Sequence, residues 1–311
     1  MTLATLLIAL ALDLALGDPP NRWHPVAWVG RALGAGRRGL SGAPPGLLLV
    51  GGAALVAALA SLTAVLALTL EYALSPWPLA AQLVDAVLLK GALSVRGLFT
   101  AVTGVRHALE AGRLETAREG LGRDLVSRPV ALLDAGQVAS GAVESLAENL
   151  TDSLVAPVLF FVLGGVPATW VYRVVNTADA MLGYHDGELE YLGKAAARLD
   201  DALNWIPARL AAAALVAAAA LAGGAGASGR RAWHALRRDG GKTASPNAGR
   251  TMAAMAGGIG VCLAKPGHYS LGDGAPPGPR AIGLALRVAA IASALAVAAS
   301  ALALAMLERG P

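Results

Sequence analysis

Long apolar runs without a single charged residue constrain this chain more than any other feature of its sequence. Residues 46–70, 153–172, 210–229 and 288–307 contain no Asp, Glu, Lys or Arg. A helix of roughly 20 apolar residues can cross the hydrocarbon core of a bilayer. Charged residues make up only 15% of the chain, compared with about 25% in a soluble domain. These runs predict an all-α, polytopic integral membrane protein.

Two further segments determine how many helices we expect. Residues 1–17 form a shorter apolar run interrupted by Asp13; they lack the basic start and cleavage site of a signal peptide, so we interpret them as a retained helix. Residues 79–105 are apolar but charged at three positions, so they either cross the membrane or lie along it as an amphipathic helix. We therefore expect one membrane domain over residues 1–311, a bundle of five or six apolar helices joined by polar loops.

Three polar connections join these helices. Residues 18–45 are rich in Pro, Gly and Arg, residues 106–128 mix both charges and predict a solvated helical segment, and residues 230–280 predict a basic loop. If residues 79–105 cross the membrane, all three connections share one side, as basic loops on the cytoplasmic side should. The connection at 173–204 then faces the opposite side, unless its polar residues lie inside the bundle and are reached through re-entrant segments.

Several common functions are disfavoured by the sequence. A single cysteine, Cys262, cannot form an internal disulfide, and five histidines without paired spacing argue against zinc. The G-x-G-x-x-G match at 224–229 ends an apolar helix instead of following a strand, and residues 241–243 resemble a P-loop without its first glycine. The net charge of +4 relates first to membrane topology, and we expect no nucleic-acid partner.

Acidic residues are concentrated in one part of the chain. Nine of the 21 carboxylates fall between positions 144 and 201. Carboxylates at or inside a bilayer are costly unless they are paired, and they usually mark a working site. We therefore expect the function to reside mainly in this region.

The first group of polar residues lies on one predicted helix. At about 100° per residue, six positions fall within an arc of roughly 80°. They are Asp134, Gln137, Gly141, Glu144, Glu148 and Asp152, and Asn149 lies beside them. Carboxylates four residues apart repel, so this stripe favours a bound cation, an arginine partner or a ligand. The alternative is a solvated helix face just before the apolar run at 153–172.

Two more groups follow along the chain. The spacing of three between Arg173, Asn176 and Asp179 places them on one helix face; Arg173 could instead be a simple membrane anchor. The third group consists of Arg198, Asp200, Asp201, Asn204 and Arg209. Its oxygen ligands, without His or Cys, suit Mg²⁺ bridging to phosphates. The alternative is a helix cap next to a Trp205 belt.

Two shorter segments belong with these groups. Asp13 lies inside an apolar helix and is followed by Asp18 and His24; a buried aspartate in a first span is usually functional. The turn that contains Ser245 and Asn247 has backbone amides that could hold an anion, although it could also be a plain turn.

At these residues the chain resembles the CobD/CbiB proteins of cobalamin biosynthesis, adenosylcobinamide-phosphate synthases of the bacterial inner membrane. The resemblance covers nearly the whole length. Its ordered blocks are DLALGDPP (13–20), HP (24–25), ESLAENLTD (144–152), YRVVNTADAMLGY (172–184), ARLDDALNWIPAR (197–209) and SPNAG (245–249). The chain departs from the family pattern at Leu150 and Thr151 and at His185, but no departure removes a carboxylate.

The resemblance implies an ATP-dependent amide ligation. The substrates would be adenosylcobyric acid and (R)-1-aminopropan-2-ol or its O-phosphate, and the product adenosylcobinamide or its phosphate. It implies ATP and Mg²⁺ as cofactors, with no tightly bound prosthetic group. The protein would be a multi-pass protein of the inner (cytoplasmic) membrane with its active site facing the cytoplasm. Its partners would be the lipid bilayer and, as a further option, other membrane corrinoid enzymes.

Residue roles follow from the chemistry that the resemblance implies. Amide ligation needs a metal to neutralise phosphate charge, cations to bind the phosphoryl group and a base for the amine. We assign the metal to Glu148 and Asp152 with Asp200 or Asp201, and the base to Glu144 or Asp179. The remaining residues would bind substrate or phosphate: Asp13, Asp18, His24, Asn149, Arg173, Asn176, Arg198, Asn204, Arg209, Ser245 and Asn247.

Three other functions compete with ligation. Composition alone favours a secondary transporter that uses Asp13 and the 144–152 stripe as an ion relay, but no matching pair of broken helices is visible in the sequence. A non-catalytic scaffold for corrinoid enzymes is another alternative, and an alcohol phosphotransferase lacks its D-G…A-R…D series. The ligase hypothesis requires the distant polar groups to meet in one pocket that opens toward the cell interior.

Overall fold

A computed structural model describes residues 1–184, 186–223, 227–265 and 267–309. Helices make up 77% of it, and the strands within the described chain are only three residues long, which confirms the all-α class. His185 and the first part of the glycine motif at 224–229 lie outside the described residues.

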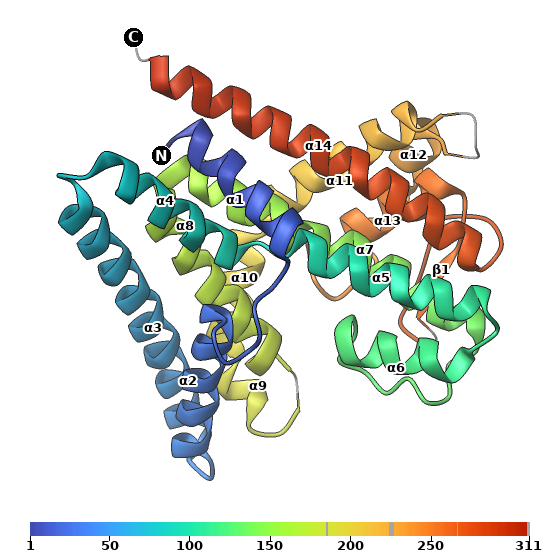
Figure 1. The fold of residues 1–311 in the computed structure, drawn as a ribbon. Helices are drawn as coiled ribbons and strands as arrows, with labels where there is room; N and C mark the ends of the chain where they lie inside the picture. The colour runs from blue at the N-terminus through green and yellow to red at the C-terminus, as the bar shows by residue number, and fades with distance from the viewer. Residues whose placement is uncertain (185, 224–226, 266, 310–311) are drawn as a thin grey trace. The chain divides into compact units, whose positions relative to one another are not determined.

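Figure 1 follows the elements along the chain. They are α1 (Leu3–Leu16), α2 (Pro25–Leu40), α3 (Pro45–Leu74), α4 (Pro78–Ala92), α5 (Val95–Glu110), α6 (Leu114–Asp124), α7 (Ala135–Leu150), the π-helical turn η1 (Thr151–Val155), α8 (Ala156–Leu182), α9 (Leu189–Leu192), α10 (Lys194–Leu203), α11 (Trp205–Leu221), α12 (Gly229–Asp239), α13 (Ala248–Ile259), β1 (Leu263–Lys265), β2 (Tyr269–Leu271) and α14 (Pro279–Arg309).

The chain packs into two compact units, and the single membrane domain over residues 1–311 stays a prediction. Unit 1 contains Met1–Ser94, Ala156–Asn204 and Ser300–Pro311; unit 2 contains Val95–Val155 and Trp205–Ala299. The chain passes from one unit to the other within or between helices and not at a linker. A boundary of this kind leaves no change in composition, so the sequence carries no signal for it.

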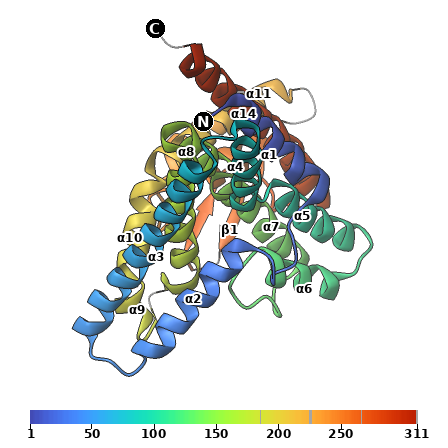
Figure 2. The ribbon, with the colours of Figure 1, turned by 60° about the vertical axis from the view of Figure 1, so that its left-hand side comes forward.

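Unit 1 is built around α3, which lies beside α2, α8, α9 and α10 (Figure 2). The core between them contains Leu33, Val56, Val174 and Leu192. Small residues allow the close approach: a Cβ on Gly52 of α3 would collide with the carbonyl of Leu192. This packing fixes the position of α8 and α10, which carry most of the candidate polar residues of unit 1.

The helix α8 folds back on itself at two glycines. Gly164 and Gly165 leave helical geometry, with φ of +70° at Gly165, a value that favours glycine. The hydroxyl of Thr169 donates to the carbonyl of Pro157 at 3.3 Å. Residues 12 apart would be about 18 Å apart along a straight helix, so the chain reverses here. The run at 153–172, predicted as one continuous span, is therefore two helical arms joined by the glycine pair.

Unit 2 contains α13, a helix of small residues that is buried along most of its length. A Cβ on Gly257 would collide with the carbonyl of Arg231 in α12, so the two helices touch at backbone distance. An antiparallel pair, β1 and β2, follows α13. The region 230–280 thus contains two packed helices and an antiparallel pair of strands where a basic loop was expected. Small residues such as Gly257 allow these helices to pack closely. The solvated segment at 106–128 contains the end of α5 and the polar helix α6.

Among the residues that the structure describes, four helical segments are long and apolar enough to cross a membrane: Pro45–Leu74, Pro78–Glu110, Ala135–Leu182 and Pro279–Glu308. The bent pair α10 and α11 makes up to five, and Leu3–Leu16 is a shorter apolar helix. The third of these segments contains the reversal at the glycine pair. The segment at 79–105 lies within the second of these, so it is long and apolar enough to cross the membrane.

The helix α3 exposes large apolar side chains over much of its length: Leu47, Leu49, Val50, Leu62, Val65, Leu66 and Leu68. Contiguous apolar surface of this kind is unfavourable in water and suits lipid. The surface of α3 therefore supports a membrane protein.

Candidate functional site

In unit 1, side chains from three parts of the chain contact the carboxylate of Asp18. The Lys90 ammonium of α4 lies 3.0 Å from Oδ1 of Asp18 and 3.7 Å from the fully buried Asp13. The hydroxyl of Ser94 donates to Oδ2 at 2.6 Å, and His24 Nε2 lies 3.7 Å from Oδ1. Burial would raise the pKa of Asp18, but the nearby His24 and hydrogen bonds from Ser94 and Lys90 outweigh it and hold the pKa well below its usual range.

The sequence places His24 so that it also caps a helix. Its Nδ1 accepts a hydrogen bond from the backbone N–H of Val26 at 3.2 Å, and Pro25 occupies the first position of α2. Because Nδ1 is an acceptor, the Nε2 that faces Asp18 carries the proton. We call Asp13, Asp18, His24, Lys90 and Ser94 the Asp18 cluster.

A second polar network in unit 1 joins α8 to α10. Asn176 Nδ2 donates to Asp200 Oδ1 at 3.2 Å, and Asn204 Nδ2 donates to Asp200 Oδ2 at 3.0 Å. The two amide oxygens accept in turn: that of Asn176 from the Arg173 guanidinium at 3.1 Å, and that of Asn204 from the buried Tyr172 hydroxyl at 3.1 Å. We call these five residues the Asp200 network. Two residues of the third predicted group, Asp200 and Asn204, are thus hydrogen-bonded to each other.

The other predicted residues of unit 1 lie next to this network. Asp179 is partly exposed on α8, and its side chain lies so close to Gly183 that a Cβ there would collide with it. Asp201 is partly exposed on α10, and Arg198 on the same helix is exposed. The Asp200 network thus lies beside a partly solvated carboxylate and an exposed guanidinium.

In unit 2, the buried Glu144 ties α7 to the hairpin. Its Oε1 accepts a hydrogen bond from Ser140 at 2.7 Å, and its Oε2 accepts from Tyr269 at 2.9 Å and lies 3.4 Å from Arg128. The Ser140 hydroxyl in turn accepts the backbone N–H of Ala264. Burial raises the pKa of Tyr269 and the charge of Glu144 raises it further, so the phenol stays protonated and donates.

The remaining part of the predicted stripe continues into a π-helical turn. Glu148 is exposed, Asp152 is partly exposed inside η1, and Asn149 donates to the carbonyl of Ser145 at 3.0 Å. Asp134 begins the stripe as the N-cap of α7 in a capping box with Gln137. π-helical turns are frequent at functional sites, and here the turn presents Asp152.

The other residues predicted in unit 2 surround the turn before α13. Arg209 stacks over the Trp205 ring at 3.8 Å and donates to Asn247 Oδ1 at 3.5 Å. The Ser245 hydroxyl accepts the backbone N–H of Asn247 at 3.2 Å, and the Thr243 hydroxyl accepts that of Gly249 at 3.0 Å. The predicted turn is confirmed. The amides expected to hold an anion already have side-chain acceptors, so Arg209 is the better anion contact.

The predicted residues therefore fall into both units. Unit 1 holds Asp13, Asp18, His24, Arg173, Asn176, Asp179, Arg198, Asp200, Asp201 and Asn204; unit 2 holds Glu144, Glu148, Asn149, Asp152, Arg209, Ser245 and Asn247. A meeting of all these groups in one pocket stays a prediction.

Several partners of these residues were missed by the sequence analysis, chiefly Lys90, Ser94, Arg128 and Tyr269. Lys90 did carry a signal, because a lysine in an apolar segment needs a buried anion. Tyr269 carried none, since it is separated from Glu144 by 125 residues.

The acidic residues fit Mg²⁺ only if a bound phosphate supplies further oxygen ligands. Within the described parts of the chain, no three His, Cys, Asp or Glu residues are grouped so that they could hold a metal ion. Asp200 already accepts two amide hydrogen bonds, whereas Glu148 and Asp152 reach solvent. Because Mg²⁺ commonly takes one or two carboxylates together with substrate phosphates, this pair fits such a role.

Comparison with known proteins then decides the family. The family model described as CobD/Cbib protein matches residues 6–298. This chain belongs to the CobD/CbiB family. "Cobalamin biosynthesis protein CobD" of Dehalococcoides mccartyi is 42% identical over 276 residues, which cover 87% of each chain. "Probable cobalamin biosynthesis protein CobD" of Methanothermobacter thermautotrophicus is 41% identical, covering 87% of this chain and 86% of the relative.

More distant relatives carry the same name. "Cobalamin biosynthesis protein CobD" of Brucella suis is 36% identical over 275 residues, covering 86% of this chain and 83% of the relative. No solved structure matches. The chain therefore has a role in cobalamin biosynthesis and, as a CobD/CbiB protein with several apolar helices, is a membrane protein.

Proposed function

We propose that this CobD/CbiB protein catalyses an ATP-dependent amide ligation. A carboxylate of adenosylcobyric acid is joined to the amine of (R)-1-aminopropan-2-ol or its O-phosphate. The carboxylate attacks the γ-phosphorus of ATP, so that ADP leaves and an acyl phosphate forms. The amine then attacks the carbonyl carbon, inorganic phosphate departs with the electrons of the C–O bond, and a base takes the proton of the amine.

The Asp200 network is the observation that carries this proposal. Two amides clamp both oxygens of Asp200, and Arg173 and Tyr172 fix the amides in turn. This series of hydrogen-bonded side chains restricts the orientation of the Asp200 carboxylate. Electrostatic catalysis requires groups that are pre-organised in this way. The exposed Arg198 and the partly exposed Asp201 extend from the same helix as Asp200 toward solvent, where a soluble substrate can reach them.

Residue roles within the proposal follow from the contacts. Glu144 is buried, whereas Asp179 is partly exposed on α8, so Asp179 is the better candidate for the base. Arg173, Arg198 and Arg209 are assigned to anionic groups of the substrates. Mg²⁺, when bound through Glu148 and Asp152, would neutralise phosphate charge. The protein would act in the cytoplasmic membrane, with these groups open to the cytoplasm.

Growth of a deletion strain tests the proposal in the cell. A strain that lacks this gene should grow on cobinamide but not on cobyric acid, and the wild-type gene should restore growth on cobyric acid. Asp201→Asn and Glu148→Gln should each fail to restore it although the protein is present in the membrane. Glu119→Gln, which changes an exposed carboxylate of α6, is the matched control and should restore growth. Normal growth with both site variants would refute the residue roles.

One observation favours a transporter as the second candidate. The reversal of α8 at Gly164 and Gly165 resembles the discontinuous helices that form binding sites in secondary transporters. Vesicles that contain the purified protein decide between the two functions. Accumulation of cobyric acid inside such vesicles without ATP would support transport, whereas ADP release that requires both cobyric acid and the amine supports the ligase.

A further inference from the structure

Unit 2 contains a cationic pocket, and Arg209 is the one lining residue to which the proposed function assigns a role. It has a volume of about 740 Å³ and lies among α11, α12, the turn after α12 and α13. Its charged and aromatic lining consists of Arg209, Trp233, Arg237, Arg238, Lys242 and Arg250, and none of its lining residues is acidic. Pockets that bind small molecules have volumes of about 300–1,000 Å³.

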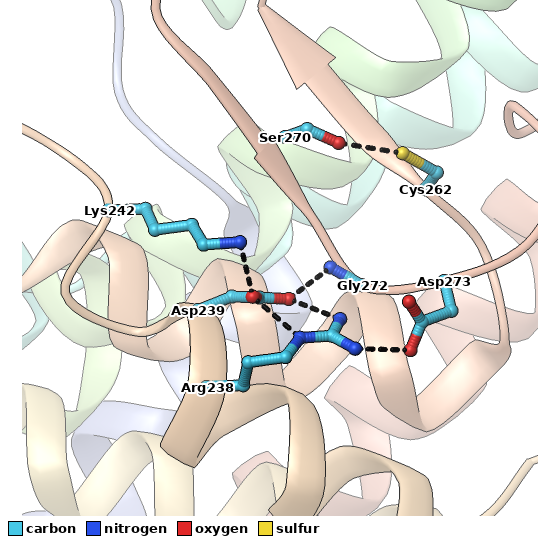
Figure 3. Close-up of polar contacts among 7 residues, drawn as sticks. All are labelled: Arg238, Asp239, Lys242, Cys262, Ser270, Gly272 and Asp273. Carbon is cyan, nitrogen blue, oxygen red and sulfur yellow. Dashed lines mark hydrogen bonds and ion pairs between the residues drawn. The ribbon is translucent and has the colours of Figure 1, made fainter.

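Two of the five cations are already neutralised. Figure 3 shows Asp239 between Arg238 and Lys242, with its carboxylate turned toward both. Arg238 binds Asp239 through two nitrogens, at 2.8 and 2.7 Å, and reaches Asp273 at 2.8 Å. Lys242 lies 2.6 Å from Asp239, which also accepts the backbone N–H of Gly272 at 2.8 Å. Because Asp239 is fully buried, this cluster holds one wall of the pocket rigid.

The other three cations have no carboxylate partner among the described residues. Arg209 donates to the neutral oxygens of Trp205 and Asn247, and Arg237 lies 5.8 Å from the centre of the Trp233 ring. The Nε of Arg250 is buried without a hydrogen-bond partner. A buried donor without a partner is costly, and three guanidinium groups on one pocket repel one another. An anion in the pocket offsets the repulsion among the three guanidinium groups.

We propose that this pocket binds the phosphate groups of a small phosphate ester. Planar guanidinium groups match phosphate oxygens in pairs, and Arg209, Arg237 and Arg250 supply three of them. Trp233 and Leu236 form an apolar side against which the uncharged part of the ester packs. Two kinds of phosphate ester have this chemistry. One is a nucleoside triphosphate, and this choice rests on the proposed function. The other is an anionic phospholipid, because the half-exposed Trp233 would lie beside its headgroup at a membrane surface.

Direct binding tests the pocket without any reaction. Full-length protein in uncharged detergent is dialysed against ATP, with neither corrinoid nor amine present. Arg250→Gln and Arg237→Gln are measured alone and together, and Arg230→Gln is the matched control because Arg230 is exposed on α12 outside the pocket. We expect the double variant to bind ATP at least tenfold more weakly, and Arg230→Gln to bind within twofold of wild type.

The lipid source is tested in a second arm. Native mass spectrometry counts the phosphatidylglycerol molecules that remain bound after purification from defined lipid. If the ester is a lipid, retention falls in the double variant and ATP binding is weak in every variant. If neither ATP binding nor lipid retention changes in the double variant, the inference is overturned.

The outcomes also separate this inference from the proposed function. Normal ATP binding by the double variant, together with normal amide synthesis and unchanged lipid retention, would overturn the pocket and leave the ligase standing. Binding of ATP through Arg237 and Arg250 without amide product would keep the pocket and reject the ligase. Thermal unfolding of each variant checks that folding is intact. If Arg250→Gln unfolds, Arg237→Gln alone still tests the pocket, because Arg237 is exposed.

Discussion

At the scale of the residue, this protein stabilises buried carboxylates with partners from distant parts of the chain. Asp13 and Asp18 share Lys90, Glu144 accepts from Tyr269, and Asp239 accepts the backbone N–H of Gly272. A buried charge that loses its partner is more costly than a buried pair replaced by apolar groups. Single substitutions in these clusters should therefore be more damaging than paired ones.

Lys90→Met is expected to lower stability strongly. It removes the ammonium that the fully buried Asp13 shares with its neighbour Asp18, a loss of roughly 3–5 kcal/mol by the behaviour of broken buried pairs. Thermal unfolding in detergent measures the effect. Lys194→Met breaks the half-exposed pair with Glu190 and serves as the control, for which about 0–1 kcal/mol is expected. Equal melting temperatures for the two variants would contradict this interpretation.

Asp239→Asn should lower stability in a pH-dependent way. Hydrogen bonds from Arg238 and Lys242 hold the pKa of Asp239 below its ordinary value, against the effect of burial. A carboxylate with a depressed folded pKa contributes its full stability above the unfolded value of about 3.9 and loses it as the pH falls toward the folded value. The difference in unfolding free energy between wild type and variant should thus be constant from pH 7 to 5 and shrink below pH 4. A difference independent of pH down to 3 would argue against the ionised pair.

At the scale of the element, glycines set how closely the helices approach. In unit 1, α3 touches α9 at Gly52, and in unit 2, α12 touches α13 at Gly257. Small residues at such contacts allow backbones to pack together in membrane proteins. The elements that carry the Asp200 network depend on this packing.

Gly52→Ala should destabilise unit 1, since its methyl group would overlap the carbonyl of Leu192. Overpacking of this kind costs about 1–3 kcal/mol. Gly46→Ala lies on the same helix with open space around it and should be neutral or slightly stabilising. A fluorescence-detected melting curve in detergent compares the two. A Gly52→Ala protein as stable as wild type would show that α3 and α9 are less tightly packed.

Local periodicity predicted the elements and the contacts that lie within one or two helices. The spacing of Asn176 from Arg173 placed these two residues correctly on one helix face, where they are hydrogen-bonded, because helix geometry fixes their separation. The Lys90–Asp18 pair, 72 residues apart, could not be predicted because it depends on tertiary packing. The reversal at Gly164 and Gly165 was missed because no charge interrupts the apolar run around it.

At the scale of the whole molecule, the chain is a membrane protein of the CobD/CbiB family with polar networks in each of two units. Unit 1 carries the Asp18 cluster and the Asp200 network, and unit 2 carries Glu144, the π-helical turn and the cationic pocket. Family membership fixes the pathway, and the proposed reaction is an amide ligation within it.

Amide synthesis by the purified protein is the most direct measurement of that step. Full-length protein in detergent is supplied with ATP, Mg²⁺, adenosylcobyric acid and aminopropanol O-phosphate, and product and ADP are quantified together. We predict one ADP for each amide formed and no product when any one component is omitted. Asp200→Asn should lose product, because it replaces one of the two carboxylate oxygens that accept from Asn176 and Asn204 with an amide nitrogen. ATP-independent uptake of corrinoid, or no amide from a folded protein with all four components present, would contradict the ligase.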